Sequence, residues 1–135
     1  MTRVRFDVAL LATVAALHLV IGGAHQHAHG AAGVENSPLQ VLFIVLVVTI
    51  APWATIWFAW KRNLMIGAVL FSVSMAASLV FGLVLHFALQ GPDLYSNVIP
   101  EYRRLFVYSA LGLALMEFVG FVLGARVAIR GRHTA

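Results

Sequence analysis

The chain has no cysteine and few charged residues, and both shortages restrict what kind of protein it is. The missing cysteines exclude disulfides, thiolate metal sites and cysteine-based catalysis. Only 10% of the 135 residues are charged, whereas a soluble domain carries about a quarter. Hydrophobic residues make up 61% of the chain. This composition is typical of an integral membrane protein, and it excludes an ordinary soluble enzyme.

The apolar residues fall into four runs, and about 20 residues are enough for a helix to cross a bilayer. The sequence predicts a single all-α transmembrane domain over residues 1–135, a four-helix bundle of up-down topology. The first run has a basic start like that of a signal peptide, but we expect it to be retained as a helix. The predicted helices cover residues 6–23, 38–60, 64–89 and 105–129, with a histidine-rich outer loop over 24–37 and a second outer loop over 90–104.

Basic residues are unequally divided between the two ends of these helices. One end carries Arg3, Arg5, Lys61, Arg62, Arg126, Arg130 and Arg132, and the other carries Arg103 and Arg104. Because cytoplasmic loops retain Lys and Arg, both termini are predicted to be cytoplasmic and both loops to face outward. We expect the protein in the cytoplasmic membrane of a prokaryote. The net charge of +4 then reflects membrane topology, and nucleic acid is not expected as a partner.

Small residues recur at helical spacing in the third and fourth runs. Membrane helices associate through close packing of such residues, since lipid is as apolar as a leucine side chain. Their faces are marked by Ser74, Ser78 and Gly82 in one run and by Gly120 and Gly124 in the other. The partner of each face is either another helix of this chain or another subunit, in a homo-oligomer or a larger membrane complex.

Histidines are concentrated after the first helix, at His25, His27 and His29, and His18 lies within that helix. Imidazole is a common ligand for Zn and Cu(II), so the tract predicts a copper or zinc site. If the helix continued past Gly22 and Gly23, His18, His25 and His29 would share one face. In an extended loop, His27 and His29 would point the same way instead. The alternative is a solvated loop whose histidines are incidental.

His18 and His86 are predicted at similar depths in two parallel helices. Ionisable residues inside a membrane are candidates for function, since an unpartnered one is costly. The pair is therefore a candidate for the axial ligands of a b-type haem, or for a metal site completed by the loop histidines. Separate hydrogen bonds between helices are the alternative. In architecture and in this pair the chain resembles bacterial four-helix b-type cytochromes. It departs from them because the second and fourth apolar runs lack histidine.

Glu117 lies near the middle of the last predicted helix, on its small-residue face. A carboxylate at that depth carries a proton, binds a cation or forms a hydrogen bond in its neutral form. In the second loop, Asp93 and Glu101 are candidate carboxylate ligands, although such residues more often form turns.

No nucleophilic triad, phosphate-binding loop or zinc-protease motif is present, so the sequence does not predict an enzyme. Three hypotheses follow. The first is a membrane protein that binds a transition metal or haem in a redox or metal-handling role. The second is a non-catalytic accessory subunit of a larger membrane complex. The third is a small proton- or cation-coupled transporter that uses Glu117.

Overall fold

The computed structural model describes residues 3–131, in which all regular structure is helical. Four segments are long and apolar enough to cross a membrane: α1 (Arg3–Ala32), Pro38–Lys61, α4 (Leu64–Phe87) and α5 (Pro100–Gly131). The second segment is divided into α2 (Pro38–Phe43), the π-helix η1 (Ile44–Ile50) and α3 (Ala51–Lys61). The prediction of an all-α chain with four long apolar helices is confirmed.

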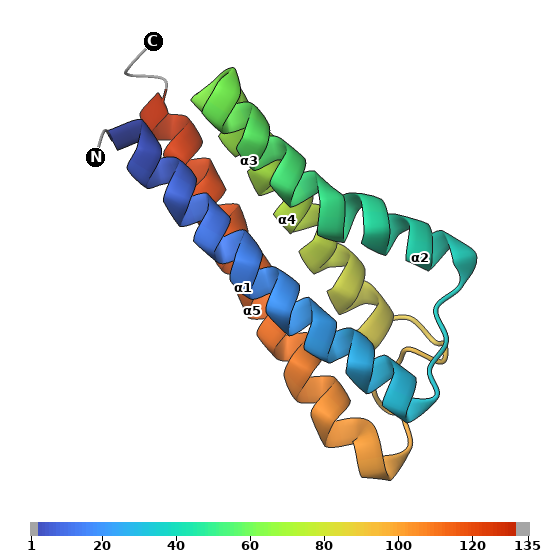
Figure 1. Ribbon diagram of the computed structural model, residues 1–135. Coiled ribbons are helices and arrows are strands. Elements are labelled where there is room, and N and C mark those ends of the chain that lie inside the picture. The colour runs from blue at the N-terminus through green and yellow to red at the C-terminus, as the bar shows by residue number, and fades with distance from the viewer. Residues whose placement is uncertain (1–2, 132–135) are drawn as a thin grey trace.

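The segments form an up-down bundle in which consecutive segments run in opposite directions (Figure 1). α1 lies beside α5, α3 lies beside α4, and α4 and α5 join the two pairs. The start of α1, the end of α5 and the turn between α3 and α4 share one end of the bundle. We call the part of the bundle near that end the terminal half. The part near the other two connections is the loop half.

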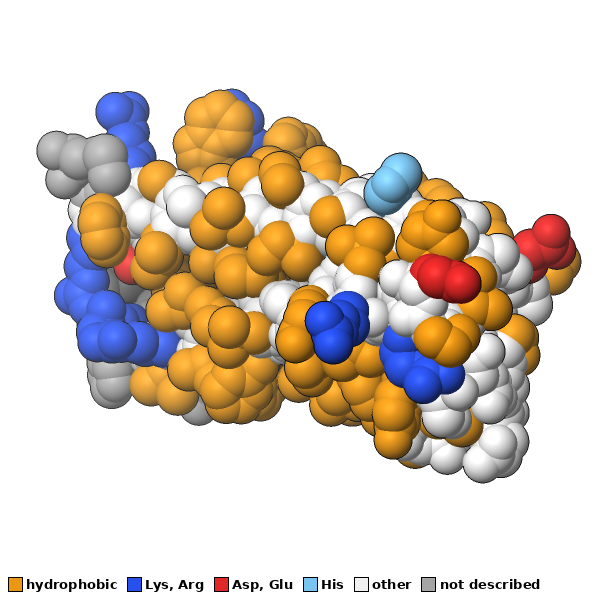
Figure 2. Space-filling view, turned by 90° about the horizontal axis from the view of Figure 1, so that it is seen from below, with side chains coloured by type: hydrophobic (Ala, Val, Ile, Leu, Met, Phe, Trp, Pro, Cys, Tyr) orange, Lys and Arg blue, Asp and Glu red, His pale blue; other side chains and the backbone are white. Residues whose placement is uncertain are grey.

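The surface is apolar along the bundle and basic at one end. Figure 2 shows hydrophobic side chains over most of one face, with Lys and Arg gathered at one end and further basic side chains nearer the other end. Exposed apolar residues occur on every segment, for example Val20, Leu39, Val80 and Phe118. The basic residues of the terminal half include Arg5, Lys61 and Arg126 at helix ends, while Arg132 lies outside the described residues.

The terminal half contains the main apolar core, which we call the apolar cluster. Its buried residues come from α1, α3, α4 and α5, and they are Leu11, Val14, Ala15, Ile56, Ala68, Phe71, Met75, Val127 and Ala128. Glycines allow the helices to approach closely around it. A Cβ on Gly120 would lie 2.5 Å from Met75, and one on Gly67 would lie 2.5 Å from the Ala59 backbone. The face of Gly120 and Gly124 is thus used inside the chain, whereas a Cβ at Gly82 would meet nothing within 4 Å.

The first helix is longer than the sequence analysis predicted. Residues 24–32, expected in the outer loop, continue α1 to Ala32. The helix ends at Gly33, whose φ of 66° only glycine adopts without strain. Val34 N–H donates to the His29 carbonyl at 3.0 Å and Gly33 N–H to the Gly30 carbonyl at 3.2 Å, as in a Schellman motif. Gly33, not Gly22 and Gly23, therefore stops the helix.

The second segment bends in the region of η1 (Figure 1). Pro52 has no N–H to donate, and its ring crowds the carbonyl four residues earlier. The wider π turn precedes it, and Ala51 N–H donates to the carbonyl of Leu46, five residues back. The π turn and the bend thus lie directly before Pro52. As a result, α2 leans away from the bundle and has no buried residue.

The connection between α4 and α5 is shorter than the second outer loop predicted over 90–104. The reason is that α5 begins at Pro100 and not near residue 105. Pro100 fits the first turn of a helix because the N–H groups there have no helical partner. Arg103, within this first turn, donates to the carbonyls of Ser96 and Val98. Val98 is buried with Ala32 and Phe106 in a small second cluster that holds the connection against α1 and α5.

Candidate metal centre

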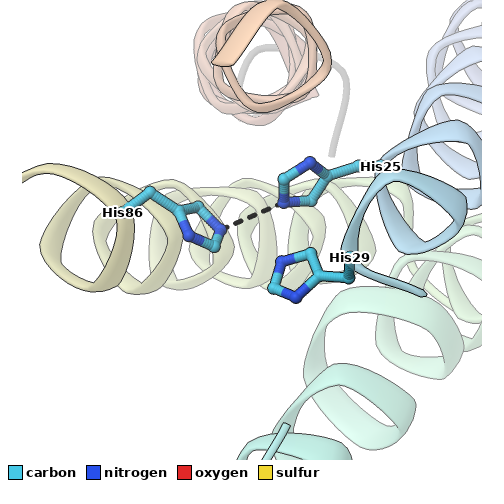
Figure 3. A group of neighbouring side chains, drawn as sticks. All are labelled: His25, His29 and His86. Carbon is cyan, nitrogen blue, oxygen red and sulfur yellow. Dashed lines mark hydrogen bonds between the residues drawn. The ribbon is translucent and has the colours of Figure 1, made fainter. Parts of the chain in front are cut away.

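Three buried histidines meet in the loop half, and we call them the histidine triad: His25, His29 and His86. His25 and His29 lie one helical turn apart on α1, and His86 lies near the end of α4. One ring nitrogen of each lies within 4.8 Å of the others. Their exposed fractions are 2%, 3% and 7%. Figure 3 shows the three rings converging on a common point from the two helices.

The hydrogen bonds of His86 determine which of its ring nitrogens is available. Its Nδ1 lies 3.2 Å from the backbone oxygen of Asp93. A carbonyl oxygen only accepts hydrogen bonds, so Nδ1 carries the proton and donates it. In the neutral ring, Nε2 then has a free lone pair. That atom faces His25, with the two Nε2 atoms 3.1 Å apart.

The same reasoning applies to His25, whose Nδ1 lies 2.9 Å from Ser109 Oγ. The Ser109 hydroxyl has one proton, which it donates to the Phe106 carbonyl at 3.0 Å. Ser109 therefore accepts from His25 Nδ1, and His25 Nε2 also has a free lone pair. Two lone pairs thus face each other and require a shared proton or a cation between them. Two nitrogens bound to one tetrahedral Zn²⁺ would be about 3.3 Å apart.

His29 faces a carboxylate. Its Nδ1 lies 3.8 Å from Asp93 Oδ1. Within the described residues, neither atom has a hydrogen-bond partner, although both are buried. The other ring nitrogen of His29 lies on the side of His25 and His86 (Figure 3). Histidine ligands commonly donate their second N–H to a carboxylate or carbonyl, which orients the ring and makes it more basic. Asp93 presents both kinds of acceptor: its carbonyl accepts from His86, and its carboxylate faces His29 at 3.8 Å.

Two further groups hold this arrangement in place. Gln40, in the first turn of α2, donates through Nε2 to Asp93 Oδ2 and accepts from the Ser37 backbone N–H. Phe106 of α5 packs against all three imidazole rings, with ring centroids 4.8 to 5.2 Å apart. The triad therefore has polar partners behind its rings and an aromatic side chain against their faces.

A cavity of about 200 Å³ adjoins the triad, and we call it the polar cavity. Its wall between the polar groups is apolar and includes Ile44, Phe81, Leu85 and Leu113. η1 supplies part of this wall. The cavity exists because the bend in the second segment leaves space between η1 and α1. All three histidines line the cavity, so an ion bound by them would have one side open to it.

A second polar pair lines the same cavity, and we call it the inner pair: His18 and Glu117. His18 Nε2 lies 3.3 Å from Glu117 Oε1. Both residues are buried, with exposed fractions of 3% and 2%. His18 lies on the same face of α1 as His25, two turns closer to the terminal half. The pair joins α1 to α5 across the bundle.

The structure brings some of the predicted site residues together and separates others. The structure brings together His25, His29 and His86. It leaves His27 exposed on the other face of α1, consistent with the helical alternative and not with the extended loop. His18 and His86 do not contact each other as a pair, since His86 contacts His25 and His18 contacts Glu117. Glu101 is exposed at the start of α5.

The supporting residues Ser109 and Gln40 were not predicted from the sequence, and Asp93 was predicted as a ligand, not as a partner behind the ligands. The spacing of His25 and His29 was a usable signal once Gly33 is taken as the helix end. Gln40 completes a capping box with Ser37, which is visible in sequence, but its contact with Asp93 is not. No sequence signal links Ser109 to His25.

No family model, curated protein or solved structure matches this chain. The assignment therefore depends on the fold and the site. Together they define a helical protein with four candidate membrane spans and a buried group of three histidines able to hold a metal ion.

Proposed function

We propose that this protein is an integral membrane metalloprotein that binds one zinc or copper ion at the histidine triad. The observation that carries the proposal is the convergence of His25 Nε2 and His86 Nε2 at 3.1 Å, while the Nδ1 of each ring is hydrogen-bonded to an oxygen atom. His29 supplies the third nitrogen. Burying three imidazoles in one place is costly, and a shared cation compensates for that cost.

The donor set narrows the choice of metal. The triad offers imidazole nitrogen alone, and the chain has no thiolate. Zinc and copper favour imidazole, whereas magnesium and calcium favour oxygen ligands. Structural zinc sites use four protein ligands, while sites that exchange ligands have three and an open position. The triad has three ligands beside a cavity, which supports a role in capturing and passing on an ion.

The charge distribution supports a location and an orientation. Four long apolar helices suit a lipid bilayer, and the basic residues of the terminal half suit its cytoplasmic side. In the cytoplasmic membrane of a prokaryote, the triad would then lie near the outer face. Ions would reach it from outside the cell.

The two other functions remain secondary proposals. An accessory subunit would also expose apolar faces, but the glycines at positions 67, 120 and 124 pack within this chain and leave fewer signals for a partner. A haem between His18 and His86 is not supported by any contact, because each ring has a different partner. A transport role for Glu117 is supported by its place in the polar cavity.

Elemental analysis of protein purified in detergent with a tag that lacks histidine tests the proposed function. After loading with Zn²⁺ or Cu²⁺ and removal of free ion, we expect tight binding at the triad that the double variant His25→Ala/His29→Ala abolishes. His27→Ala is the matched control, because it removes an exposed histidine from the same helix, and it should leave binding unchanged. Equal binding by all three proteins, or none by the wild type, would overturn the proposal.

A further inference from the structure

We propose that the inner pair, His18 and Glu117, is a second station for the same divalent metal ion, reached from the histidine triad through the polar cavity. This inference rests on the proposed function of the triad and extends it from binding to movement of the ion into the membrane interior.

The geometry of the inner pair fits a metal ion. His18 Nε2 and Glu117 Oε1 lie 3.3 Å apart, the separation of about 3.3 Å expected for two ligands on one tetrahedral Zn²⁺. Imidazole nitrogen and carboxylate oxygen occur together in many zinc sites. Both side chains are at least nine-tenths buried, and both line the polar cavity.

The polar cavity also presents hydroxyl oxygens that a metal ion can bind. Ser78 and Thr49 line the cavity together with the pair. Ser78 donates its hydroxyl proton to the Ser74 carbonyl at 3.0 Å, so the lone pairs of its oxygen remain for a cation or a water molecule. Two protein ligands with hydroxyl or water oxygens make a weaker site than the triad. A weaker site suits a station that an ion occupies in transit.

Charge supports the same assignment. The residues that line the polar cavity include one carboxylate, that of Glu117. A divalent ion in a low-dielectric interior needs a nearby negative charge. His18 is seven residues from His25 along α1, so the two stations are about 10 Å apart. The carboxylate thus lies where an ion leaving the neutral triad for the bundle interior would be stabilised.

Binding at the inner pair is an exchange reaction. The ion forms bonds to His18 Nε2 and to Glu117 Oε1 and displaces the proton that these two atoms share. That proton is released to solvent, so each ion that enters the pair releases one proton there. The simpler alternative is that the pair is a permanent hydrogen bond that holds α1 against α5.

Titration with Co²⁺ or Zn²⁺, followed by equilibrium dialysis, separates the two possibilities. We expect about two ions per wild-type chain, one held tightly and one at least tenfold more weakly. Glu117→Gln should lose the weaker ion and keep the tighter one, whereas His86→Ala should lose the tighter one. Asp7→Asn is the matched control, since it neutralises another buried carboxylate of the bundle that does not line the cavity.

The variant Glu117→Gln retains the shape of the side chain and a hydrogen bond to His18, and circular dichroism in detergent checks that the variant is folded. If the wild type and Glu117→Gln both bind a single ion, the inner pair is structural and this inference is wrong, although the triad stands. If Glu117→Gln loses an ion and His86→Ala does not, the inner pair is a metal site and the proposed function of the triad is wrong.

Discussion

The two halves of the bundle are built differently. In the terminal half, most buried side chains are apolar, and Leu11, Phe71 and Met75 are fully enclosed. The buried polar residues there are Asp7, Ser72 and Ser74. In the loop half, the buried residues include the histidine triad and Asp93, next to a cavity. Close packing associates membrane helices without a cluster of buried imidazoles, although hydrogen bonds between helices add to it. The concentration of buried imidazoles in one half indicates where the function lies.

The second segment shows the contrast within a single stretch of chain. α3 packs closely against α4 in the terminal half, with Ala59 buried beside Gly67. α2 has no buried residue in the loop half, yet its Gln40 is bonded to Asp93 beside the triad. The change occurs at η1 and Pro52. The bend thus separates α3, which packs in the bundle, from α2, which leans away from it and leaves room for the polar cavity.

The largest effect on stability is expected from the substitution Gly67→Val in the terminal half. The added side chain would start 2.5 Å from the Ala59 backbone, so α3 and α4 must separate. We expect the free energy of unfolding to fall by about 3 kcal/mol, as for severe overpacking of a core. Equilibrium unfolding in mixed micelles measures this change.

Gly82→Ala is the matched control for Gly67→Val, because a Cβ at Gly82 meets nothing within 4 Å. Alanine favours a helix over glycine by about 1 kcal/mol, so stability should be unchanged or slightly higher. Equal destabilisation by both variants would show that the two helices do not pack as described.

In the loop half, His86→Ala should act in the opposite way to Gly67→Val. It should greatly weaken metal binding and have little effect on the stability of the apolar cluster. Removing one of three ligands should weaken zinc or copper binding by about a hundredfold, which corresponds to about 2.7 kcal/mol. A competition titration with a metal-sensitive dye measures the affinity. His27→Ala should bind as the wild type does, and similar losses in the two variants would contradict the assignment of ligands.

Asp93→Asn tests the partner behind the ligands. The amide lacks the negative charge that orients His29 Nδ1–H, while the backbone carbonyl that accepts from His86 remains. Loss of such a partner typically weakens metal binding by about 10- to 100-fold. The same titration should therefore place this variant between the wild type and His86→Ala. An unchanged affinity would show that the 3.8 Å gap between His29 and Asp93 does not close around an ion.

The smallest effect on metal affinity is expected from a decrease in pH. Metal binds imidazole in its neutral form, so protons compete with the ion for the triad nitrogens. Affinity should fall as the pH is lowered, by about tenfold between pH 7 and pH 5. Dialysis at a series of pH values measures this loss. An affinity that rises with acidity would contradict a site made of histidines.

Most of the fold was readable from the sequence, because its signals are local. Four apolar runs predict four helices, and Pro38, after the N-cap Ser37, begins the second one as expected. The end of α1 was placed nine residues too early. Gly22 and Gly23 were taken as a stop, whereas the packed faces of His25 and His29 continue the helix to the positive φ of Gly33. Tertiary packing here outweighs a weak local preference.

The candidate site was readable only in part. Histidine spacing identified His25 and His29 as one possible group, and helix depth drew attention to His86. Depth alone paired His86 with His18, and the structure assigns each a different neighbour. That choice depends on the rotation of each helix about its axis and on the bend at η1. Neither is encoded locally. The contacts of Ser109 and Gln40 depend on the same long-range packing.

X-ray absorption at the metal edge of the zinc- or copper-loaded protein tests the central claim most directly. The measurement uses one tight equivalent of ion per chain. The account predicts a first shell that contains three imidazole nitrogens at about 2.0 Å, and fewer imidazole rings in the shell for His86→Ala. A first shell of oxygen atoms alone, or one unchanged in His86→Ala, would show that the ion lies elsewhere and would contradict the histidine triad as the metal site.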